Sequence, residues 1–343
     1  MMLDFTLRRL NLLFFTLLML SIVAFSLNYL FPGDALINMS GEIAMSESRR
    51  LQLIELYHFD AGIFSQYIAY MGQIFSANFG VSMATSAPIS SELMIRLPAT
   101  IELCLAALTL ALLLGMPLGF VAAIFHNSPL DKGILAFAML GYSIPVFWLA
   151  LILILVFSIT LSWLPSAGQL NLLFDIETVT GFKLIDILIS DSPHRSAALR
   201  DALLHLILPS VAVALAPMTI FIRLARTSML DVLDSNYIKA ARAKGLSKPM
   251  IIYRHGIRNA LVGIVRQVGL QFANIVTIAM IAEVIFAWQG AGSWLIESIE
   301  ARDYTAIQGG LIALATFTFV INIIADFMYV ALNPLERYKK HGG

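Results

Sequence analysis

Long apolar stretches dominate the pattern of hydrophobic and polar positions along this chain. A helix needs about 20 consecutive apolar residues to cross the hydrocarbon core of a bilayer, because its backbone polar groups must be satisfied within the segment. Six stretches meet this requirement: Leu10 to Phe31, Pro98 to Phe125, Ile134 to Trp163, Ala202 to Leu224, Ile264 to Trp288 and Ala306 to Leu332. The pattern therefore predicts an all-α integral membrane protein with six transmembrane helices.

The composition supports this interpretation. Of the 343 residues, 59% are hydrophobic and 13% are charged, and the mean hydropathy is +0.83. Soluble domains are roughly 45–50% apolar and about 25% charged, so that class of protein is excluded. The formal net charge is zero, which gives no bulk attraction for nucleic acid. The single cysteine, Cys104, excludes an intramolecular disulfide, and its apolar surroundings predict a packing role.

The basic residues are distributed unevenly between the two sides of the predicted membrane. With the N-terminus inside, fifteen Lys and Arg residues fall on the inner side and seven on the outer side. Nine of the fifteen lie between Arg223 and Arg266. Because Lys and Arg accumulate in short cytoplasmic loops, this distribution predicts that both termini are cytoplasmic.

The spans divide the chain into a predicted order of segments. Residues 1–31 form an N-terminal stub and the first helix, residues 32–97 a periplasmic loop, residues 98–332 the core with the other five helices, and residues 333–343 a cytoplasmic tail. The core includes a second periplasmic loop, 164–201, and a cytoplasmic loop, 226–263. Apolar residues recur through 51–70 of the first loop, which predicts one or two amphipathic helices against the membrane surface.

Motifs for catalysis and phosphate binding are missing from the sequence. It has no G-x-x-x-x-G-K-[ST] loop, no H-E-x-x-H and no G-x-S-x-G, and its six histidines are scattered. We therefore predict no catalytic residue, no metal site and no cofactor in this chain. An intramembrane enzyme, or a scaffold whose basic loop only sets topology, is the rival interpretation.

Two acidic residues inside predicted spans are candidates for a substrate pathway. Glu102 lies near the outer end of the second span and Glu283 near the outer end of the fifth. Ionisable groups at this depth are costly, so each is a functional hypothesis. Their alternative role is structural, either at a helix end or in a hydrogen bond between helices. Prolines at 117, 145, 209 and 217 predict kinks at four positions within the spans.

The cytoplasmic loop from Thr227 to Leu261 predicts a helix, a glycine break and a second helix. Apolar side chains at 229, 232, 233, 238 and 241 form a stripe, and the acids at 231 and 234 are typical of an early turn of a helix. Gly245 and Pro249 are placed to end one element and start the next. A short amphipathic helix in such a loop can dock into a groove of another protein, whereas the alternative is a solvated basic loop.

Lys239-Ala240-Ala241, three further residues and Gly245 resemble the E-A-A-x-x-x-G loop of permease subunits of bacterial ATP-binding-cassette importers. The peptide-type permeases match best, through Y-[IV]-[KR]-x-A-x-A-K-G-L-S and R-H-x-x-R-N-A-L. The residues on this pattern are Tyr237, Lys239, Ala241, Ala243, Lys244, Gly245, Leu246, Arg254, His255, Arg258, Asn259, Ala260 and Leu261. Similar segments occur at Phe5–Leu10, Leu97–Leu103, Gly141–Leu151, Glu283–Gly292 and Asn333-Pro334. Thr180–Pro193 and Asn236–Ala241 resemble the Sap-type permeases of this family.

The resemblance implies a type I importer permease of the bacterial inner membrane that carries peptides. It implies four kinds of partner: a second homologous permease, two cytoplasmic ATPase subunits that bind ATP and Mg, a periplasmic peptide-binding protein and the lipid bilayer. The loop would couple to the ATPase through Tyr237, Lys239, Ala240, Ala241, Lys244, Gly245 and Leu246, with Ala241 and Leu246 in contact with it. Sap-type systems are linked to resistance to cationic antimicrobial peptides. The alternative within the same type of complex is a polyamine exporter or a regulator of ion uptake.

Three residues depart from the family pattern. Lys239 replaces the acidic residue of the general loop, Gly263 stands where proline is usual, and Gln289 replaces the proline of the W-P-G-x-G outer turn. Gly290 and Gly292 are retained, so the turn is expected to form. These departures put coupling efficiency in question more than family membership.

Overall fold

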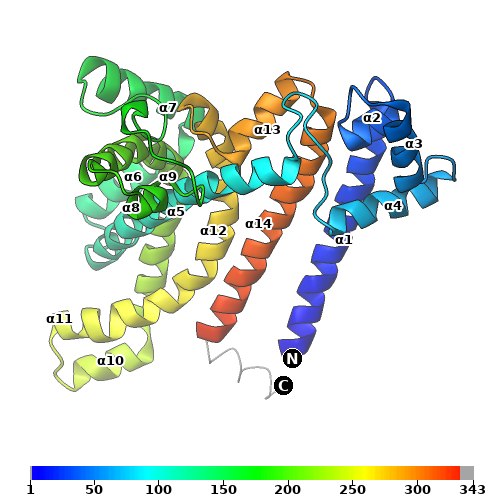
Figure 1. Cartoon of the computed structure of the whole chain (residues 1–343). Coiled ribbons are helices and arrows are strands. Elements are labelled where there is room, and N and C mark those ends of the chain that lie inside the picture. The colour runs from blue at the N-terminus through cyan, green and yellow to red at the C-terminus, as the bar shows by residue number, and fades with distance from the viewer. Residues whose placement is uncertain (1, 333–343) are drawn as a thin grey trace. The chain divides into compact units, whose positions relative to one another are not determined.

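The computed structural model describes residues 2–332, and regular structure in this range is helical (Figure 1). The predicted tail at 333–343, including Asn333-Pro334, lies outside the described residues. The elements are α1 (Met2–Leu30), α2 (Ala35–Ser40), α3 (Glu47–Leu56), α4 (Ile63–Phe75), α5 (Ile89–Ile124), α6 (Pro129–Ser143), α7 (Val146–Leu153), η1 (Ile154–Thr160), η2 (Leu172–Phe174), α8 (Lys183–Ile189), α9 (Arg195–Asp234), α10 (Asn236–Ala243), α11 (Lys248–Met250), η3 (Ile251–Ile257), α12 (Arg258–Ile285), α13 (Ala291–Glu300) and α14 (Tyr304–Leu332).

Five helical segments are long and apolar enough to cross a membrane, and a bent pair makes up to six. The five are Asn11–Leu30, Ile89–Ile124, Arg195–Asp234, Gln267–Ile285 and Tyr304–Ile324. Each overlaps one of the six predicted stretches, so the hydrophobic pattern located the spans. The remaining stretch, predicted as one helix from Ile134 to Trp163, is different.

The third predicted span is broken rather than continuous. It consists of Pro129–Ser143 and Val146–Thr160, which are bent by 101° relative to each other. Pro145 has no N–H to continue the helix, and a proline disfavours helical geometry in the residue before it. Ile144 is accordingly extended, with φ −84° and ψ 122°. The other predicted kink positions lie inside uninterrupted elements, since α5 and α9 each continue through their prolines.

The fourth span also departs from its predicted end. α9 continues for 40 residues to Asp234, so Asp231 and Asp234, expected in the first turn of a separate helix, lie in the last turns of α9. The chain breaks at Ser235, whose ψ of 152° is extended. The segment predicted as a loop therefore begins with the last two turns of α9.

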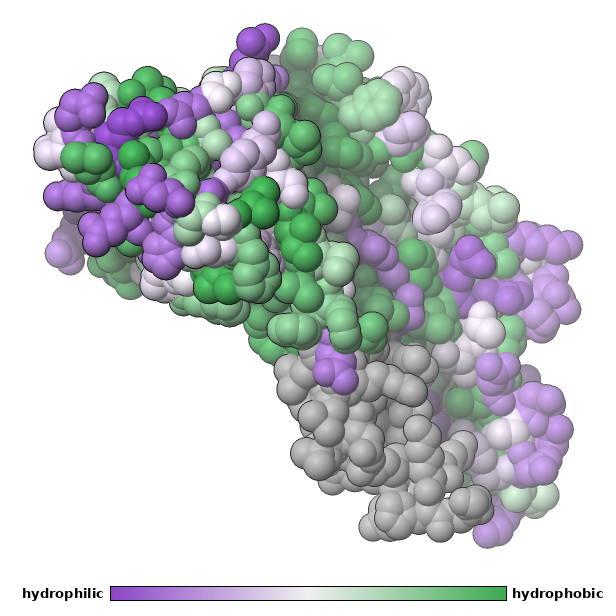
Figure 2. All heavy atoms as spheres, turned by 90° about the vertical axis from the view of Figure 1, so that its right-hand side faces the viewer, coloured by the Kyte–Doolittle hydropathy of each residue, from purple (hydrophilic) through white to green (hydrophobic). Residues whose placement is uncertain are grey.

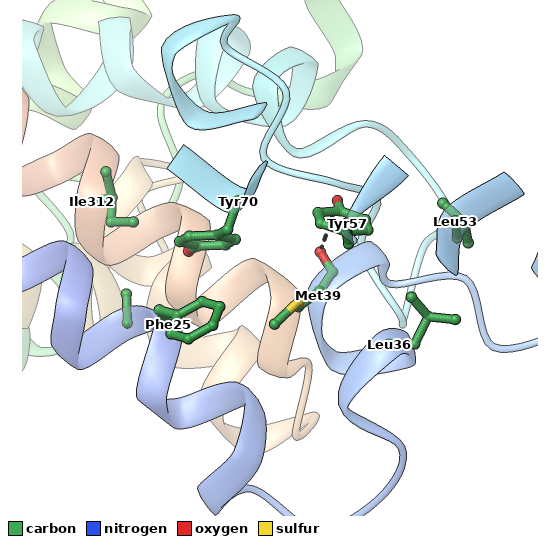
Figure 3. Packing of buried hydrophobic residues seen from close by; sticks show 8 residues of the cluster. Phe25, Leu36, Met39, Leu53, Tyr57, Tyr70 and Ile312 are labelled. Carbon is green, nitrogen blue, oxygen red and sulfur yellow. Dashed lines mark hydrogen bonds between the residues drawn. The ribbon is translucent and has the colours of Figure 1, made fainter. Parts of the chain in front are cut away.

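The described chain divides into two compact units. The first contains residues 2–100, Ile176–Asp186 and Gln289–Val320, and the second contains Ile101–Asp175, Ile187–Trp288 and residues 321–332. The predicted periplasmic loop after α1 belongs to the first unit and folds into α2, α3 and α4, so the expected helices are confirmed. Their buried side chains form one cluster with α1 and α14 (Figure 3): Ala24, Phe25, Leu36, Met39, Leu53, Tyr57, Tyr70 and Ile312.

Small residues allow close helix packing in the second unit. A Cβ added to Gly119 of α5 would lie 2.4 Å from the Ile222 carbonyl oxygen and 2.7 Å from the Ala225 Cβ of α9. α9 is also joined to α6, because the Thr219 hydroxyl donates to the Ala138 carbonyl at 2.8 Å. The C-terminal half of α9, which leads to the predicted coupling loop, is therefore packed directly against α5 and α6.

Candidate functional site

The predicted coupling loop forms a helical hairpin between α9 and α12 (Figure 1). α10 is its first arm, and its second arm is α11 followed by the π-helical η3, which continues into α12. Pro249 occupies the first turn of α11, where a missing N–H costs nothing. The predicted order of helix, glycine break and second helix is confirmed.

The turn at the tip of the hairpin is a Schellman motif. Gly245 has φ +81°, in the left-handed region that favours glycine. Its N–H donates to the Arg242 carbonyl at 3.0 Å, and the Leu246 N–H donates to the Ala241 carbonyl at 3.3 Å. These two hydrogen bonds satisfy carbonyls at the end of α10. In a Schellman motif the side chains of the residues joined by the outer bond, here Ala241 and Leu246, typically lie in contact. The motif thus links Ala241 and Leu246, the two residues predicted to contact a partner.

The hairpin is anchored to the helices on either side. Ile238 of α10 and Met229 of α9 are fully buried, and α10 contacts both α9 and η3. Gly256 allows the close approach, because a Cβ there would lie 2.6 Å from the Met229 Cε. The Asn259 side-chain amide donates to the Tyr237 hydroxyl at 3.2 Å. Movement of α10 must therefore displace the ends of α9 and α12.

The outward surface of the hairpin carries the predicted coupling residues. Tyr237, Lys239, Ala240, Lys244 and Gly245 are exposed, while Ala241 and Leu246 are half-buried. Four of the seven lie in α10, and Lys244, Gly245 and Leu246 form the turn that follows it. From Asn236 to Arg258 the sequence has six Lys or Arg residues and no Asp or Glu, so a partner with an acidic surface is favoured. Lys239 pairs with Asp234 at 3.0 Å, but both side chains are exposed, and such pairs stabilise little.

The two acidic residues predicted for a substrate pathway lie in the second unit, away from its surface. Glu102 is in α5 and Glu283 in α12, and both are buried. After Glu283 the chain turns as expected, with the Trp288 N–H donating to the Glu283 carbonyl at 2.8 Å and Gly290 preceding α13. In the part of the chain that the structure describes, no group of three His, Cys, Asp or Glu residues is placed to hold a metal ion.

Sequence reasoning missed a polar cluster beside the hairpin. Arg226 of α9 pairs with the buried Asp131 of α6, and its guanidinium also contacts the His126 ring at 2.9 Å. Ser128 begins α6 and its hydroxyl accepts the Asp131 N–H at 3.3 Å. The Ser128-Pro129 pair followed by an acid is a recognisable helix start, and it would have located Asp131 at a helix end. Its partner, 95 positions further along the chain, has no sequence signal.

Comparison with known protein families identifies the family of this chain. A family model described as "Binding-protein-dependent transport system inner membrane component" matches residues 115–338. A second model, "Binding-prot-dependent transport system membrane comp, N-term", matches residues 2–104. The chain belongs to this family of transport permeases. It is accordingly a multi-pass protein of the bacterial inner membrane.

Relatives of this permease match it over nearly its whole length. It is 38% identical to the di/tripeptide transport system permease protein DppB of Pseudomonas aeruginosa (strain UCBPP-PA14), covering 99% of this chain and 100% of the relative. It is 40% identical to the peptide transport system permease protein SapB of Salmonella typhimurium, covering 98% of each chain. The putrescine export system permease protein SapB of Escherichia coli (strain K12) is also 40% identical, with the same coverage.

A solved structure shares the permease fold. The inward-facing MetNI methionine ABC transporter matches with a TM-score of 0.53 and 16% sequence identity, covering 70% of this chain and 96% of the matched chain. At this identity the likeness bears on the fold alone. Together with the family, it establishes the predicted all-α fold of an ABC importer permease.

Proposed function

We propose that this chain is the transmembrane permease subunit of an ATP-binding-cassette peptide transporter. The observation that carries the proposal is its 38–40% identity, over 98–99% of its length, to relatives named as di/tripeptide and peptide transport permeases. Cationic antimicrobial peptides are a candidate subset of the cargo. ATP and Mg bind to partner subunits in this scheme, and this chain supplies the path and the coupling element.

The hairpin from Tyr237 to Leu246 docks onto a cytoplasmic ATPase subunit. Three features support this role: its outward surface is exposed, its charge is uniformly basic, and Ile238 and Met229 anchor it to α9. Ala241 and Leu246 form the apolar contact at the Schellman turn, and Tyr237, Lys239, Ala240 and Lys244 surround it. Closure of an ATPase pair moves the hairpin, and the ends of α9 and α12 move with it.

The complete assembly contains a second homologous permease, two ATPase subunits and a periplasmic peptide-binding protein. Both termini of this chain lie in the cytoplasm in this scheme, which the excess of Lys and Arg in the inner segments supports. The binding protein docks on the opposite side, where the two long loops lie.

Glu102 and Glu283 are proposed to face the substrate path when it opens. Carboxylates beside such a path attract a cationic peptide. Because both side chains are buried in this conformation, the role requires a movement that exposes them during transport. Substitution of either residue by Gln is expected to reduce uptake of cationic peptides more than that of neutral ones.

A polyamine exporter is the second candidate, because one relative of equal identity is named as a putrescine export permease. The two candidates differ in the direction of transport and in dependence on a binding protein. An importer moves cargo only when that protein is present, whereas an exporter acts without it.

The test is co-purification of the complex from membranes in mild detergent, followed by ATPase and transport assays in proteoliposomes. Wild type is compared with Gly245→Trp, using a peptide mixture with its binding protein and, separately, putrescine. We expect ATPase subunits to accompany wild type, peptide to stimulate their activity, and Gly245→Trp to lose that stimulation.

Gly133→Trp is the control. Gly133 lies in α6, where an added Cβ meets nothing within 4 Å, and it is outside both the hairpin and the two long loops. Equal loss of stimulation in both variants would contradict the coupling role of the hairpin. Absence of any ATPase subunit from the wild-type preparation would contradict the permease assignment, and ATP-driven putrescine movement without peptide stimulation would favour the exporter.

A further inference from the structure

α4 differs sharply in charge from the helix that precedes it. α3 has four charged residues among ten, Glu47, Arg49, Arg50 and Glu55, whereas the thirteen residues of α4 include none. Figure 2 looks onto the side of the molecule that carries this segment, and hydrophilic and hydrophobic side chains gather there in separate areas. Neighbouring helices of one external segment therefore suit different surroundings.

The polar groups of α4 point inward and its apolar groups point outward. The Tyr67 and Ser21 hydroxyls hydrogen-bond at 2.7 Å, and the Gln66 side chain accepts from the Tyr29 hydroxyl. On the outer face, Phe75 is 83%, Phe64 is 73% and Ile68 is 56% exposed. At about 100° per residue these three lie on one face of the helix. In water, a helix favours apolar side chains inside and polar side chains outside. A lipid environment favours the opposite arrangement, which α4 has.

The attachment of α4 to α1 sets its depth. Its side chains contact α1 between Ser21 and Tyr29, through hydrogen bonds and through the packing of Phe25 against Tyr67 and Tyr70. All these residues of α1 lie inside its apolar segment Asn11–Leu30. Ser21 is nine residues from Leu30, about 13 Å along a helix. That distance is within the half-thickness of about 15 Å of a hydrocarbon core.

The surface of α1 at the same depth, on the faces turned away from α4, is also apolar and exposed. Met19, Ile22 and Val23 have 57%, 41% and 55% of their surfaces exposed. The outer face of α4 and this part of α1 are therefore apolar at the same depth, and together they define an apolar zone of the first unit. A water-facing or charged protein partner would leave this zone unmatched, whereas acyl chains match it without polar contacts.

We propose that α4 lies in the membrane, with Phe64, Ile68 and Phe75 inserted among the acyl chains of the leaflet on the Leu30 side of α1. In the proposed orientation this is the outer leaflet. α4 is then an interfacial anchor that holds the external segment α2–α4 at the membrane, and α3 remains in water.

The single cysteine makes this placement directly measurable. In a Cys104→Ala background, Phe64→Cys, Ile68→Cys and Phe75→Cys each receive a nitroxide label, and the complex is reconstituted in nanodiscs of phosphatidylethanolamine and phosphatidylglycerol. Power-saturation electron paramagnetic resonance then compares collisions with oxygen, which partitions into lipid, and with a nickel chelate, which stays in water. Val23→Cys on α1 is the lipid reference, and Glu55→Cys on α3 is the water reference.

We expect oxygen accessibility to exceed nickel accessibility at the three α4 positions, as at Val23, and the reverse at Glu55. Greater nickel accessibility on α4 would place this face in water and overturn the proposal. Low accessibility to both reagents would also overturn it, because that result means that a protein subunit covers α4. The substituted positions are exposed, so each label reports on the surroundings without disturbing the core.

Discussion

Arg226 and Asp131 form a bidentate ion pair that joins α9 to the start of α6. The Arg226 Nε lies 2.7 Å from Asp131 Oδ1, and its Nη2 lies 2.8 Å from Oδ2. The Asp131 side chain is 2% exposed and the Arg226 side chain 19%. Oδ2 of Asp131 also accepts the Asn127 N–H at 2.9 Å. The pair therefore fastens α9 to α6 ten residues before α10, the first arm of the proposed coupling hairpin, begins.

Breaking this pair should destabilise the permease. Asp131→Ala leaves the mostly buried guanidinium of Arg226 without its carboxylate, at a cost of about 3 kcal/mol. We expect a lower melting temperature for Asp131→Ala and for Arg226→Ala in detergent, with the double variant losing less than the sum of the two. Lys239→Ala breaks an exposed pair instead and should change stability by no more than about 0.5 kcal/mol. Additive losses would show that the two residues act separately.

Close packing of α5 on α9 depends on Gly119. Gly119→Ala places a methyl group 2.4 Å from a backbone oxygen, so the helices must separate and the variant should melt at a lower temperature. Gly133 in α6 is the control, because a Cβ there meets nothing within 4 Å. Gly133→Ala should be neutral or stabilising by up to about 1 kcal/mol, from helix propensity alone. Equal melting temperatures for the two variants would argue against tight packing at Gly119.

The Schellman turn requires a left-handed residue at Gly245, and the space around it is open. Coupling should therefore follow backbone preference rather than side-chain volume. We expect Gly245→Asn to retain most peptide-stimulated ATPase activity, Gly245→Ala to lose part of it, and Gly245→Val to lose most, because left-handed geometry costs an ordinary residue about 1–2 kcal/mol. If ATPase stimulation instead fell with increasing side-chain size, so that Gly245→Asn was less active than Gly245→Ala, this explanation would be contradicted.

Asp303 organises the turn before α14 in the first unit. Its Oδ2 accepts the Ser82 hydroxyl at 2.5 Å and the Ala84 N–H at 3.2 Å, while Oδ1 accepts the Ala306 N–H at 3.0 Å. Asp303→Ala leaves these donors without their acceptor and should cost about 1–3 kcal/mol. Faster proteolysis of the segment around Ser82 is the expected result. Glu300→Ala, at an exposed position nearby, should leave the cleavage rate unchanged.

Tyr57 should make the external segment sensitive to alkaline pH. Burial raises the pKa of Tyr57 to about 12 from its ordinary value of about 10. The neutral phenol is favoured in the fold, so its stabilising contribution is complete below pH 10 and is lost as pH rises from 10 to 12. Wild type should lose more thermal stability than Tyr57→Phe between pH 9 and pH 11. Parallel losses in both proteins would show that Tyr57 does not contribute.

The broken third span shows which structural features local sequence can predict and which it cannot. Pro145 interrupts the helix and Ile144 before it is extended, whereas the helices continue through the prolines of α5 and α9, and the apolar run on both sides of Pro145 reads as one crossing. The 101° bend depends on how the two halves pack against their neighbours. Similarly, the acids at 231 and 234 favour the first turn of a helix, but they lie in the last turns of α9, which ends at Asp234.

The candidate site also combines features that the sequence predicts with features that it does not. The positions of the coupling residues and the glycine turn were predictable, because a left-handed turn is a property of the backbone at Gly245 itself. The burial of Ile238 and Met229 followed from the stripe, whereas the role of Gly256 did not, because its contact with Met229 is made only when the hairpin folds back.

By itself, the sequence determined the membrane class, the location of the spans and the helix–glycine–helix order of the coupling loop, because hydropathy and backbone freedom act over a few neighbouring residues. Only the tertiary structure decided that Asp131 meets Arg226, that Gly119 lies against α9, and which face of α4 is turned outward. Those outcomes depend on which helices come together, and contacts between residues far apart in the chain have no local signature.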